Sequence, residues 1–526
     1  MTEGSASRTA PILIGAVALV GIVALVLVLQ VQGQGSGSDE IPGWAQDPPV
    51  LQPLVDFAHQ ESEFRTVLPA YSQGRGAMLR SLDGLGEDEA TERQLAWYHS
   101  WLDELRSLDF ETLSVEGQVD YIGLRNRLEF EIAMVEEGQE VIGGGQGPVG
   151  EAGLRAHLQR EMIPYTAEEL IAIGEAEFEW MDEAMLEASR AMGFGDDWHA
   201  AQEAVKEAWV PPGDKPGLIR DLAYQSEEFL EERGDITQPP LMREIWRMGM
   251  RGPQGQLTNP FFTGGEQVTI SYPTYDMTHD FKLMSARGNN PHFNRATVHH
   301  ELIPGHGHQG FMTSRFNNHR QMFNTPFWGE GWALYWEFLL WDQDFPRGPE
   351  DEIGMLTWRM HRAARIVFSM SYHLGRMTEE EAVEYLVERV GFDRSNSEAE
   401  VRRSVRATPL YQIAYMIGGL QLYALYDEMV NSGRMESREF HDMILQGGRM
   451  PIELVRLRMT GEGLTPDYTT QWRFYGDPLV ANWYRYYYGF DPLFTWWVQT
   501  PYAEFTEARE AYSAAIGEAW SVSIED

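Results

Sequence analysis

Four of the chain's 14 histidines lie within ten residues, at His299, His300, His306 and His308. Glu301 follows the second of them directly. Imidazole nitrogens and one carboxylate are the groups that zinc requires in sites where a water molecule is activated beside the metal. The segment therefore predicts a site for one zinc ion per chain, with Glu301 as the general base.

The spacing of these histidines is wider than in the common helical zinc motif, where the two ligands stand four residues apart. His306 follows His300 by six residues, so in a regular helix it would lie about 120° away around the axis. Pro304 lacks the N–H that would bond back to His300, and Gly305 relaxes the backbone beside it. We expect a kink or wide turn at these two residues, which brings His306 back toward the metal.

A third ligand must come from another segment, and residues 328–337 are the best source. Glu330 and Glu337 lie seven residues apart there, on nearly the same face of a helix. Both stand among tryptophan and leucine residues, where an unpaired carboxylate would be costly. We predict Glu330 as the third ligand and Glu337 as the residue that orients a ligand histidine. His299 and His308 are expected to pack around the site without binding the metal.

Together the two segments resemble a bacterial family named domain of unknown function 885, which is similar to zinc metallopeptidases of the glutamate-zincin kind. The family pattern is His-Glu-x-x-Pro-Gly-His-His-x-Gln, followed by Glu-Gly-Trp-Ala-x-Tyr-x-Glu. The chain matches it at His300, Glu301, Pro304, Gly305, His306, Gln309, Glu330, Gly331, Trp332, Ala333, Tyr335 and Glu337. Gly307 departs from the pattern, because the family usually has a second histidine there.

The resemblance covers roughly residues 50–460 and includes three further segments, 365–373, 409–418 and 440–448. It implies a mainly helical fold with two lobes around a deep cleft. It also implies that Tyr415 donates to the oxyanion of the transition state, and that His373 does the same or binds substrate. Leu410, Tyr411 and Met416 depart from the family pattern beside Tyr415, so substrate contacts there can differ.

Helical patterns position these residues. Apolar residues at positions 121, 124, 128, 132 and 135 form one helical stripe. Thr166 and Glu169 are spaced as a capping box that starts a helix extending to Met192. Further helices are expected at about 327–343, 350–373, 378–390, 409–431 and 437–446. Alternation of Val268 and Ile270 predicts a small β element near the metal site, either an edge for an extended peptide or simple packing.

Residues 11–29 form an uncharged apolar run of about 28 Å as a helix, close to the roughly 30 Å of a bilayer core. We predict a transmembrane anchor, preceded by a cytoplasmic tail at 1–10 and followed by a flexible tether at 30–45. A signal peptide cleaved near residue 33 is the alternative, and it would make the protein secreted. Arg8 precedes the run and the next basic residue is Arg65, which places the bulk of the chain outside the cytoplasm.

The remaining residues, 46–526, are expected to form one helical zinc-hydrolase domain. Its parts are an N-terminal lobe at 46–260, a metal-site lobe at 261–465 and an aromatic-rich extension at 466–526, which either packs on the domain or supplies a dimer, carbohydrate or membrane contact. The formal charge of −39 disfavours nucleic acid as a partner. The absence of cysteine excludes thiolate catalysis and cysteine ligands.

These observations predict a zinc-dependent metallopeptidase that hydrolyses short peptides outside the cytoplasm. Two alternatives remain open at this point. One is a non-catalytic relative that binds a peptide or a partner in the same cleft, against which the intact Glu301 argues. The other is a zinc hydrolase of non-peptide amides or esters. The sequence leaves the oligomeric state open, a homodimer included.

Overall fold

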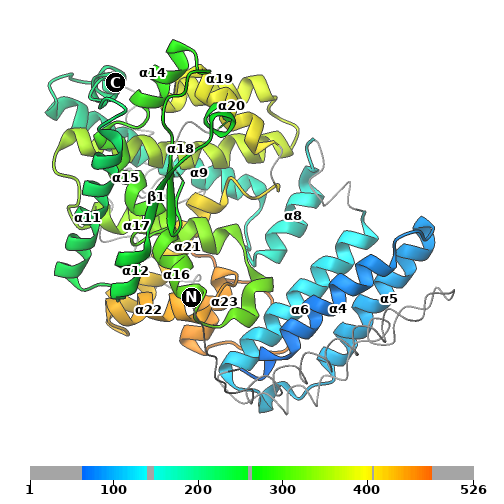
Figure 1. The fold of residues 1–526 in the computed structure, drawn as a ribbon. Helices are drawn as coiled ribbons and strands as arrows, with labels where there is room; N and C mark the ends of the chain where they lie inside the picture. The colour runs from blue at the N-terminus through cyan, green and yellow to red at the C-terminus, as the bar shows by residue number, and fades with distance from the viewer. Residues whose placement is uncertain (1–61, 139–146, 259–262, 406–407, 477–526) are drawn as a thin grey trace, which may run out of the picture.

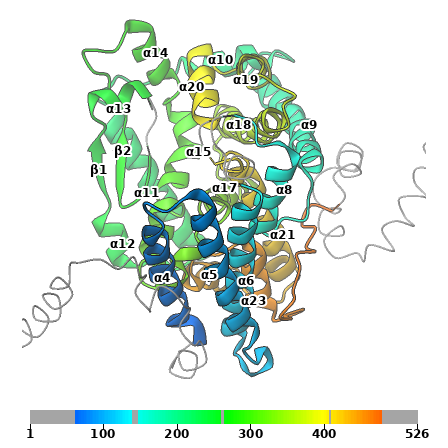
Figure 2. The same ribbon diagram turned by 90° about the vertical axis from the view of Figure 1, so that its right-hand side faces the viewer.

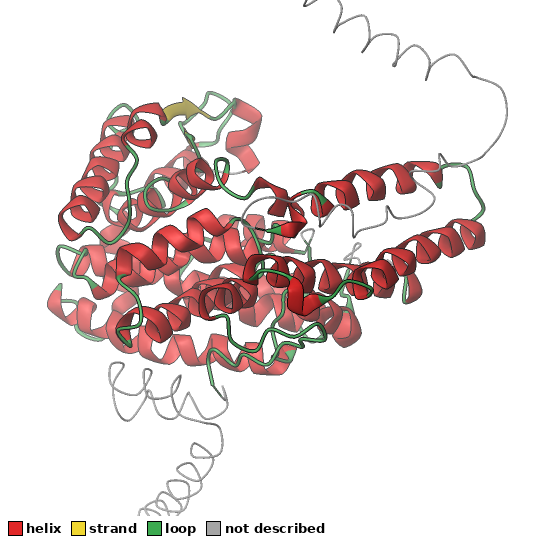
Figure 3. Ribbon diagram, turned by 90° about the horizontal axis from the view of Figure 1, so that it is seen from below, coloured by secondary structure: helices red, strands yellow, loops and turns green. Residues whose placement is uncertain are grey.

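The computed structural model describes residues 62–138, 147–258, 263–405 and 408–476. Helices dominate these ranges (Figure 3), which confirms the expected mainly helical fold. The strands of the described residues are β1 (Arg247–Met250) and β2 (Gln267–Ile270), which pair in parallel. Within the same ranges no helix is long and apolar enough to cross a membrane. The predicted tail, anchor and tether, at 1–45, lie outside them, as does the rest of the chain before residue 62.

Three helices near the N-terminal end form an arm that extends away from the rest of the molecule (Figure 1). They are α4 (Val67–Ser81), α5 (Glu87–Arg106) and α6 (Val115–Glu136); the short η1 (Glu63–Arg65) precedes α4, and η2 (Phe110–Thr112) lies between α5 and α6. The ring of Tyr71 on α4 packs against Trp97 and Trp101 of α5, with centroids 5.4 and 5.1 Å apart. The predicted stripe of α6 is buried at positions 121, 124, 128 and 132. Aromatic and aliphatic packing therefore holds the arm together.

The body of the molecule is built on two long helix pairs. α9 (Ala167–Ala191) lies along α18 (Pro349–His373), and α17 (Pro326–Asp342) lies along α21 (Ala414–Tyr426). α15 (Pro291–Glu301) contacts both α17 and α18, and α11 (Lys215–Arg233) covers α15. Figure 2 shows the two strands at the periphery of this body. Helices from both expected lobes therefore share one continuous hydrophobic core.

Shorter elements complete the described fold. They are α8 (Gly150–Arg160), α10 (Trp198–Lys206), α12 (Pro240–Ile245), α13 (Pro253–Thr258), α14 (His279–Arg287), α16 (His306–Thr313), η3 (Asn318–Phe323), α19 (Glu379–Val390), α20 (Arg394–Ser404), η4 (Asp427–Asn431), α22 (Ser437–Gly447) and α23 (Ile452–Thr460).

The predicted helix boundaries agree with the structure to within one or two residues at α9, α17, α18, α19 and α22. At α9, the Thr166 hydroxyl accepts from the N–H of Glu169, and the Glu169 carboxylate accepts from the N–H of Thr166. The predicted helix at 409–431 is wrong at both ends. Turns replace its first residues, so that α21 begins at Ala414, and its last residues form a π-helical turn, η4.

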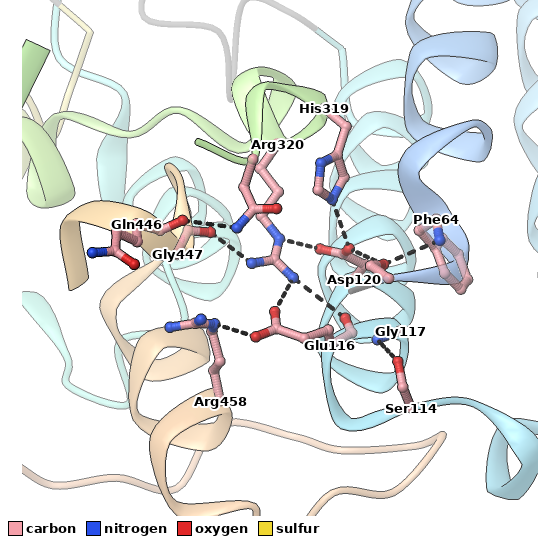
Figure 4. Close-up of polar contacts among 12 residues, drawn as sticks. Phe64, Ser114, Glu116, Gly117, Asp120, His319, Arg320, Gln446, Gly447 and Arg458 are labelled. Atoms are coloured by element: carbon pink, nitrogen blue, oxygen red, sulfur yellow. Dashed lines mark hydrogen bonds and ion pairs between the residues drawn. The ribbon is translucent and has the colours of Figure 1, made fainter. Parts of the chain in front are cut away.

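A buried polar network ties the arm to the body (Figure 4). Asp120 on α6 is fully buried and accepts a hydrogen bond of 2.6 Å from Nε of Arg320 in η3. Arg320 also donates to the carbonyl of Gly447 and to Glu116, each at 2.6 Å, and Arg458 of α23 donates to Glu116. Burial alone would raise the pKa of Asp120, but the Arg320 guanidinium and His319 lower it to about 2. The paired charges therefore fix α6 against η3, α22 and α23.

The described part of the predicted C-terminal extension packs against α9 and the residues just before it. The ring of Phe474 meets that of Tyr165 with centroids 5.0 Å apart. The hydroxyl of Tyr475 donates to Glu177 at 2.9 Å. Residues 466–476 thus pack on the domain, which was one of the alternatives for the extension. Residues 477–526 lie outside the described ranges.

Candidate metal centre

The helix that carries the histidines is interrupted where a bend was predicted. α15 ends at Glu301 and α16 begins at His306, with an irregular turn between them. A Cβ on Gly305 would lie 1.8 Å from the carbonyl oxygen of His300, so glycine is required for this close approach. Nε1 of Trp332 donates to the carbonyl of Pro304 at 2.8 Å and fixes the turn to α17. The turn removes the 120° offset that a regular helix would impose.

Two glycines bring the backbones of α17 and α21 into contact. A Cβ on Gly331 would lie 2.6 Å from Cα of Gly418, and a Cβ on Gly418 would lie 2.3 Å from the carbonyl oxygen of Phe327. Any larger side chain at either position would push the helices apart. This contact sets Glu330, next to Gly331, close to Tyr415, three residues before Gly418.

His300, His306 and Glu330 converge as predicted. One ligand atom from each lies within 4.8 Å of the others. Oε2 of Glu330 is 3.1 Å from Nε2 of His306 and 3.8 Å from Nε2 of His300. Ligand atoms about 2.0–2.1 Å from a tetrahedral zinc ion stand roughly 3.3 Å from one another. The three side chains therefore fit a zinc ion, a metal that takes four ligands in a tetrahedron.

Glu337 orients the ring of His300. Its Oε1 accepts from Nδ1 of His300 at 2.7 Å, which leaves Nε2 of that ring available to a metal ion. Nη2 of Arg362 stands 3.3 Å from the same oxygen. Burial disfavours the protonated form of His300, but Glu330 and Glu337 outweigh burial and raise its pKa to about 9. Glu337 thus stands where the sequence predicted it, behind His300.

Two tyrosines surround Glu330, and only one of them was expected. The hydroxyl of Tyr411 donates to Oε1 of Glu330 at 2.6 Å and lies 3.5 Å from the hydroxyl of Tyr415. The ring of Tyr415 stacks parallel to that of His300, with centroids 6.1 Å apart. Burial and the charge of Glu330 raise the pKa of Tyr415 well above its ordinary value, so its hydroxyl stays protonated and can donate. The sequence signal for Tyr411 was its departure from the family pattern, four residues from Tyr415.

The predicted base is held by a backbone group that the sequence did not indicate. Oε2 of Glu301 accepts from the N–H of Gly264 at 2.5 Å, and its carbonyl accepts from the N–H of Gly265. A Cβ on Gly264 would lie 1.9 Å from the carbonyl oxygen of Glu301. Thr263, the residue before this pair, exchanges hydrogen bonds with Thr269 of β2 on the edge away from β1. The small β element therefore lies near the site, as predicted, and positions the carboxylate.

A cavity of about 330 Å³ opens onto these groups, and its lining includes Glu301, the three candidate ligands and Tyr415. All its described lining residues fall between positions 263 and 415. The cavity therefore lies within the predicted metal-site lobe, and α9 and α11 pack on α18 and α15. Three arginines that were not predicted also line the cavity, Arg362, Arg365 and Arg403.

The structure does not bring His373 to the cavity. This residue ends α18 and is buried, and burial together with nearby His157 of α8 lowers its pKa to about 4. His299 and His308 are fully buried, and their pKa values fall to about 3, mainly because of burial. Both pack beside the site, outside the group that converges on Glu330, as expected.

Comparison with known proteins places this geometry in a family. No curated protein sequence matches the chain significantly. Two solved structures share its fold, each described as a "putative lipoprotein": one from Shewanella oneidensis (16% identity, TM-score 0.51, 83% of this chain and 86% of that one) and one from Colwellia psychrerythraea (17% identity, TM-score 0.51, 76% and 75%). A family model described as "Bacterial protein of unknown function (DUF885)" matches residues 147–459, more than half of the sequence. The chain belongs to this family.

Proposed function

We propose that this protein is a zinc-dependent metallopeptidase that hydrolyses short peptides outside the cytoplasm. The observation that supports it is the convergence of His300, His306 and Glu330 in the wall of the cavity that also contains Glu301. A purely structural cluster has no need of a carboxylate such as Glu301, which a backbone N–H holds at the cavity. A general base must stand in such a position.

Each residue of the candidate site has a separate role in the proposed hydrolysis. Glu301, held at Oε2 by Gly264, takes a proton from the attacking water and passes it to the nitrogen that leaves. Tyr415 donates from its protonated hydroxyl to the carbonyl oxygen as negative charge develops there. When bound, a zinc ion supplies a Lewis acid that lowers the pKa of a water molecule toward about 7. Tyr411 and Glu337 position the ligands Glu330 and His300.

The proposed location rests on the N-terminal sequence and on the comparisons. Both structurally similar proteins are described as a "putative lipoprotein". A lipid attached through cysteine is not available to this sequence, which has no cysteine. We therefore assign membrane attachment to the apolar run at 11–29, with the described residues on the outer side.

Metal analysis and one substitution test the proposal. The purified protein should contain about one zinc ion per chain. Glu301→Gln should retain the metal and lose about 100- to 10,000-fold in the hydrolysis of a mixed peptide library. Glu266→Gln, which alters an exposed carboxylate close to β2, is the matched control and should retain activity. Full activity in Glu301→Gln, or no zinc bound after zinc is offered, would refute the proposal.

A further inference from the structure

One wall of the cavity carries more positive than negative charge. Arg365 of α18 donates from Nε to Oε1 of Glu400 at 2.7 Å, and Arg403 of α20 donates from Nη2 to Oε2 at 2.8 Å. All three residues line the cavity. Two guanidinium groups thus share one carboxylate, which leaves one positive charge without a partner in this group.

The buried arginine of this pair retains free donors. The side chain of Arg365 is 6% exposed, and within the described residues its Nη1 and Nη2 make no hydrogen bond. A guanidinium group has five donors and is never deprotonated in proteins, so the free Nη groups of Arg365 stay charged and can donate to an acceptor in the cavity. Within the same ranges, Arg403 uses only Nη2, and its side chain is 49% exposed. The wall is therefore built to receive an anion that enters from the cavity.

The distance from this wall to the candidate metal ligands is short. Cζ of Arg365 lies 4.3 Å from the ring centre of Tyr415, and the ring centre of His300 lies 6.1 Å from the same point. His300 and Arg365 are therefore no farther apart than these distances added together, about 10 Å. An extended peptide covers about 3.3–3.6 Å per residue, and a contact distance is needed at each end. One or two residues fit between a bond cleaved beside His300 and an anion bound at Arg365.

Resting on the proposed peptidase function, we propose that Arg365 and Arg403 bind the C-terminal carboxylate of the substrate. The protein then removes one or two residues from the C-terminal end of short peptides. Paired guanidinium groups match a carboxylate by parallel N–H···O hydrogen bonds. In the reaction the water oxygen bonds to the carbonyl carbon, the C–N bond breaks, and the freed amine takes the proton. The cavity of about 330 Å³ lies at the lower end of small-ligand sites and suits a chain end.

Binding to the full-length, zinc-loaded Glu301→Gln variant tests this assignment. The probes are a blocked pentaalanine with a free C-terminal carboxylate, the same peptide as its C-terminal amide, and an amide whose last residue is aspartate. Calorimetry should show the free acid binding about 10- to 100-fold more tightly than the plain amide, the range that charged hydrogen bonds supply. Adding Arg403→Gln should reduce this preference about tenfold. Adding Arg402→Gln, which removes an exposed arginine beside it that does not line the cavity, should leave the preference unchanged.

The outcomes separate the two proposals. Equal binding of acid and amide, or a preference unchanged by Arg403→Gln, overturns the carboxylate site, whether or not the active protein cleaves peptides. An aspartate amide that binds as tightly as the free acid overturns recognition of the chain end. Mass spectrometry of products from the active protein should show loss of one or two C-terminal residues. No cleavage of any peptide, with the acid preference intact, overturns the peptidase function and leaves the carboxylate site standing.

Discussion

Glu337 provides a test of how a residue behind the ligand sphere contributes to metal affinity. Its side chain is 4% exposed and accepts from Nδ1 of His300 at 2.7 Å. In Glu337→Gln the amide oxygen can still accept this hydrogen bond, while the negative charge is lost. Partners of this kind contribute roughly 10- to 100-fold to metal affinity. Because Arg362 already offsets part of the charge, we expect the lower half of this range, about 10- to 30-fold.

Competition with a chromophoric zinc chelator measures this loss. Urea unfolding of the metal-free variant should show a separate cost of about 1–3 kcal/mol, because Arg362 loses a charged acceptor. That cost leaves the protein folded, since domains of ordinary stability unfold at about 5–15 kcal/mol. Glu266→Gln is again the control for loss of one negative charge. A zinc affinity within twofold of wild type, in a variant that folds normally, would refute the argument that Glu337 acts through His300.

Three further predictions concern packing, pH and catalysis. Gly331→Ala should lower the free energy of unfolding by about 1–3 kcal/mol, because its Cβ would meet Gly418. Gly329→Ala, whose Cβ would have nothing within 4 Å, should not lower it, and urea unfolding compares the two variants. Burial lowers the pKa of His441 to about 4 from about 6.5 in the unfolded chain, so its neutral ring stabilises the fold above pH 6.5. This contribution, about 3 kcal/mol, is lost as pH falls from 6.5 to 4. The free energy of unfolding should therefore drop less between pH 7 and pH 4.5 in His441→Gln than in the wild type. Tyr415→Phe should keep zinc and KM while kcat falls about 100- to 1,000-fold in peptide assays; an unchanged kcat contradicts its role as donor.

Local signals in the sequence predicted the bounds of α9, α17, α18, α19 and α22, and they singled out three side chains that converge at the cavity. The capping pair Thr166 and Glu169 is complete within four residues, so its hydrogen bonds do not depend on the rest of the fold. The turn at Gly305 was predictable because a regular helix would separate the histidines. The requirement that both histidines approach one metal ion predicted the bend, which helix geometry alone would not indicate.

Contacts between segments distant in the sequence could not be predicted from these local signals. Tyr411 bonds to Glu330 across 81 positions, and Gly264 bonds to Glu301 across 37. The turn at 409–413 that precedes α21 was expected to be helical, because its residue types do not oppose the start of a helix. Arg365 stood out only as the first residue of the family-like segment 365–373, and nothing in the sequence singled out Arg403. Helices α18 and α20 bring both residues to Glu400.

The glycine contact between α17 and α21 makes the candidate site preorganised. Glu330 and Tyr415 are attached to two backbones that touch directly, with no intervening side chain whose rotation could change their separation. Little reorganisation then remains for the moment of reaction, because the donor and the ligand oxygen are already set when the chain has folded. Activity and folded structure should accordingly be lost together on heating. The smallest residues of the motif thus fix the positions of its reactive groups.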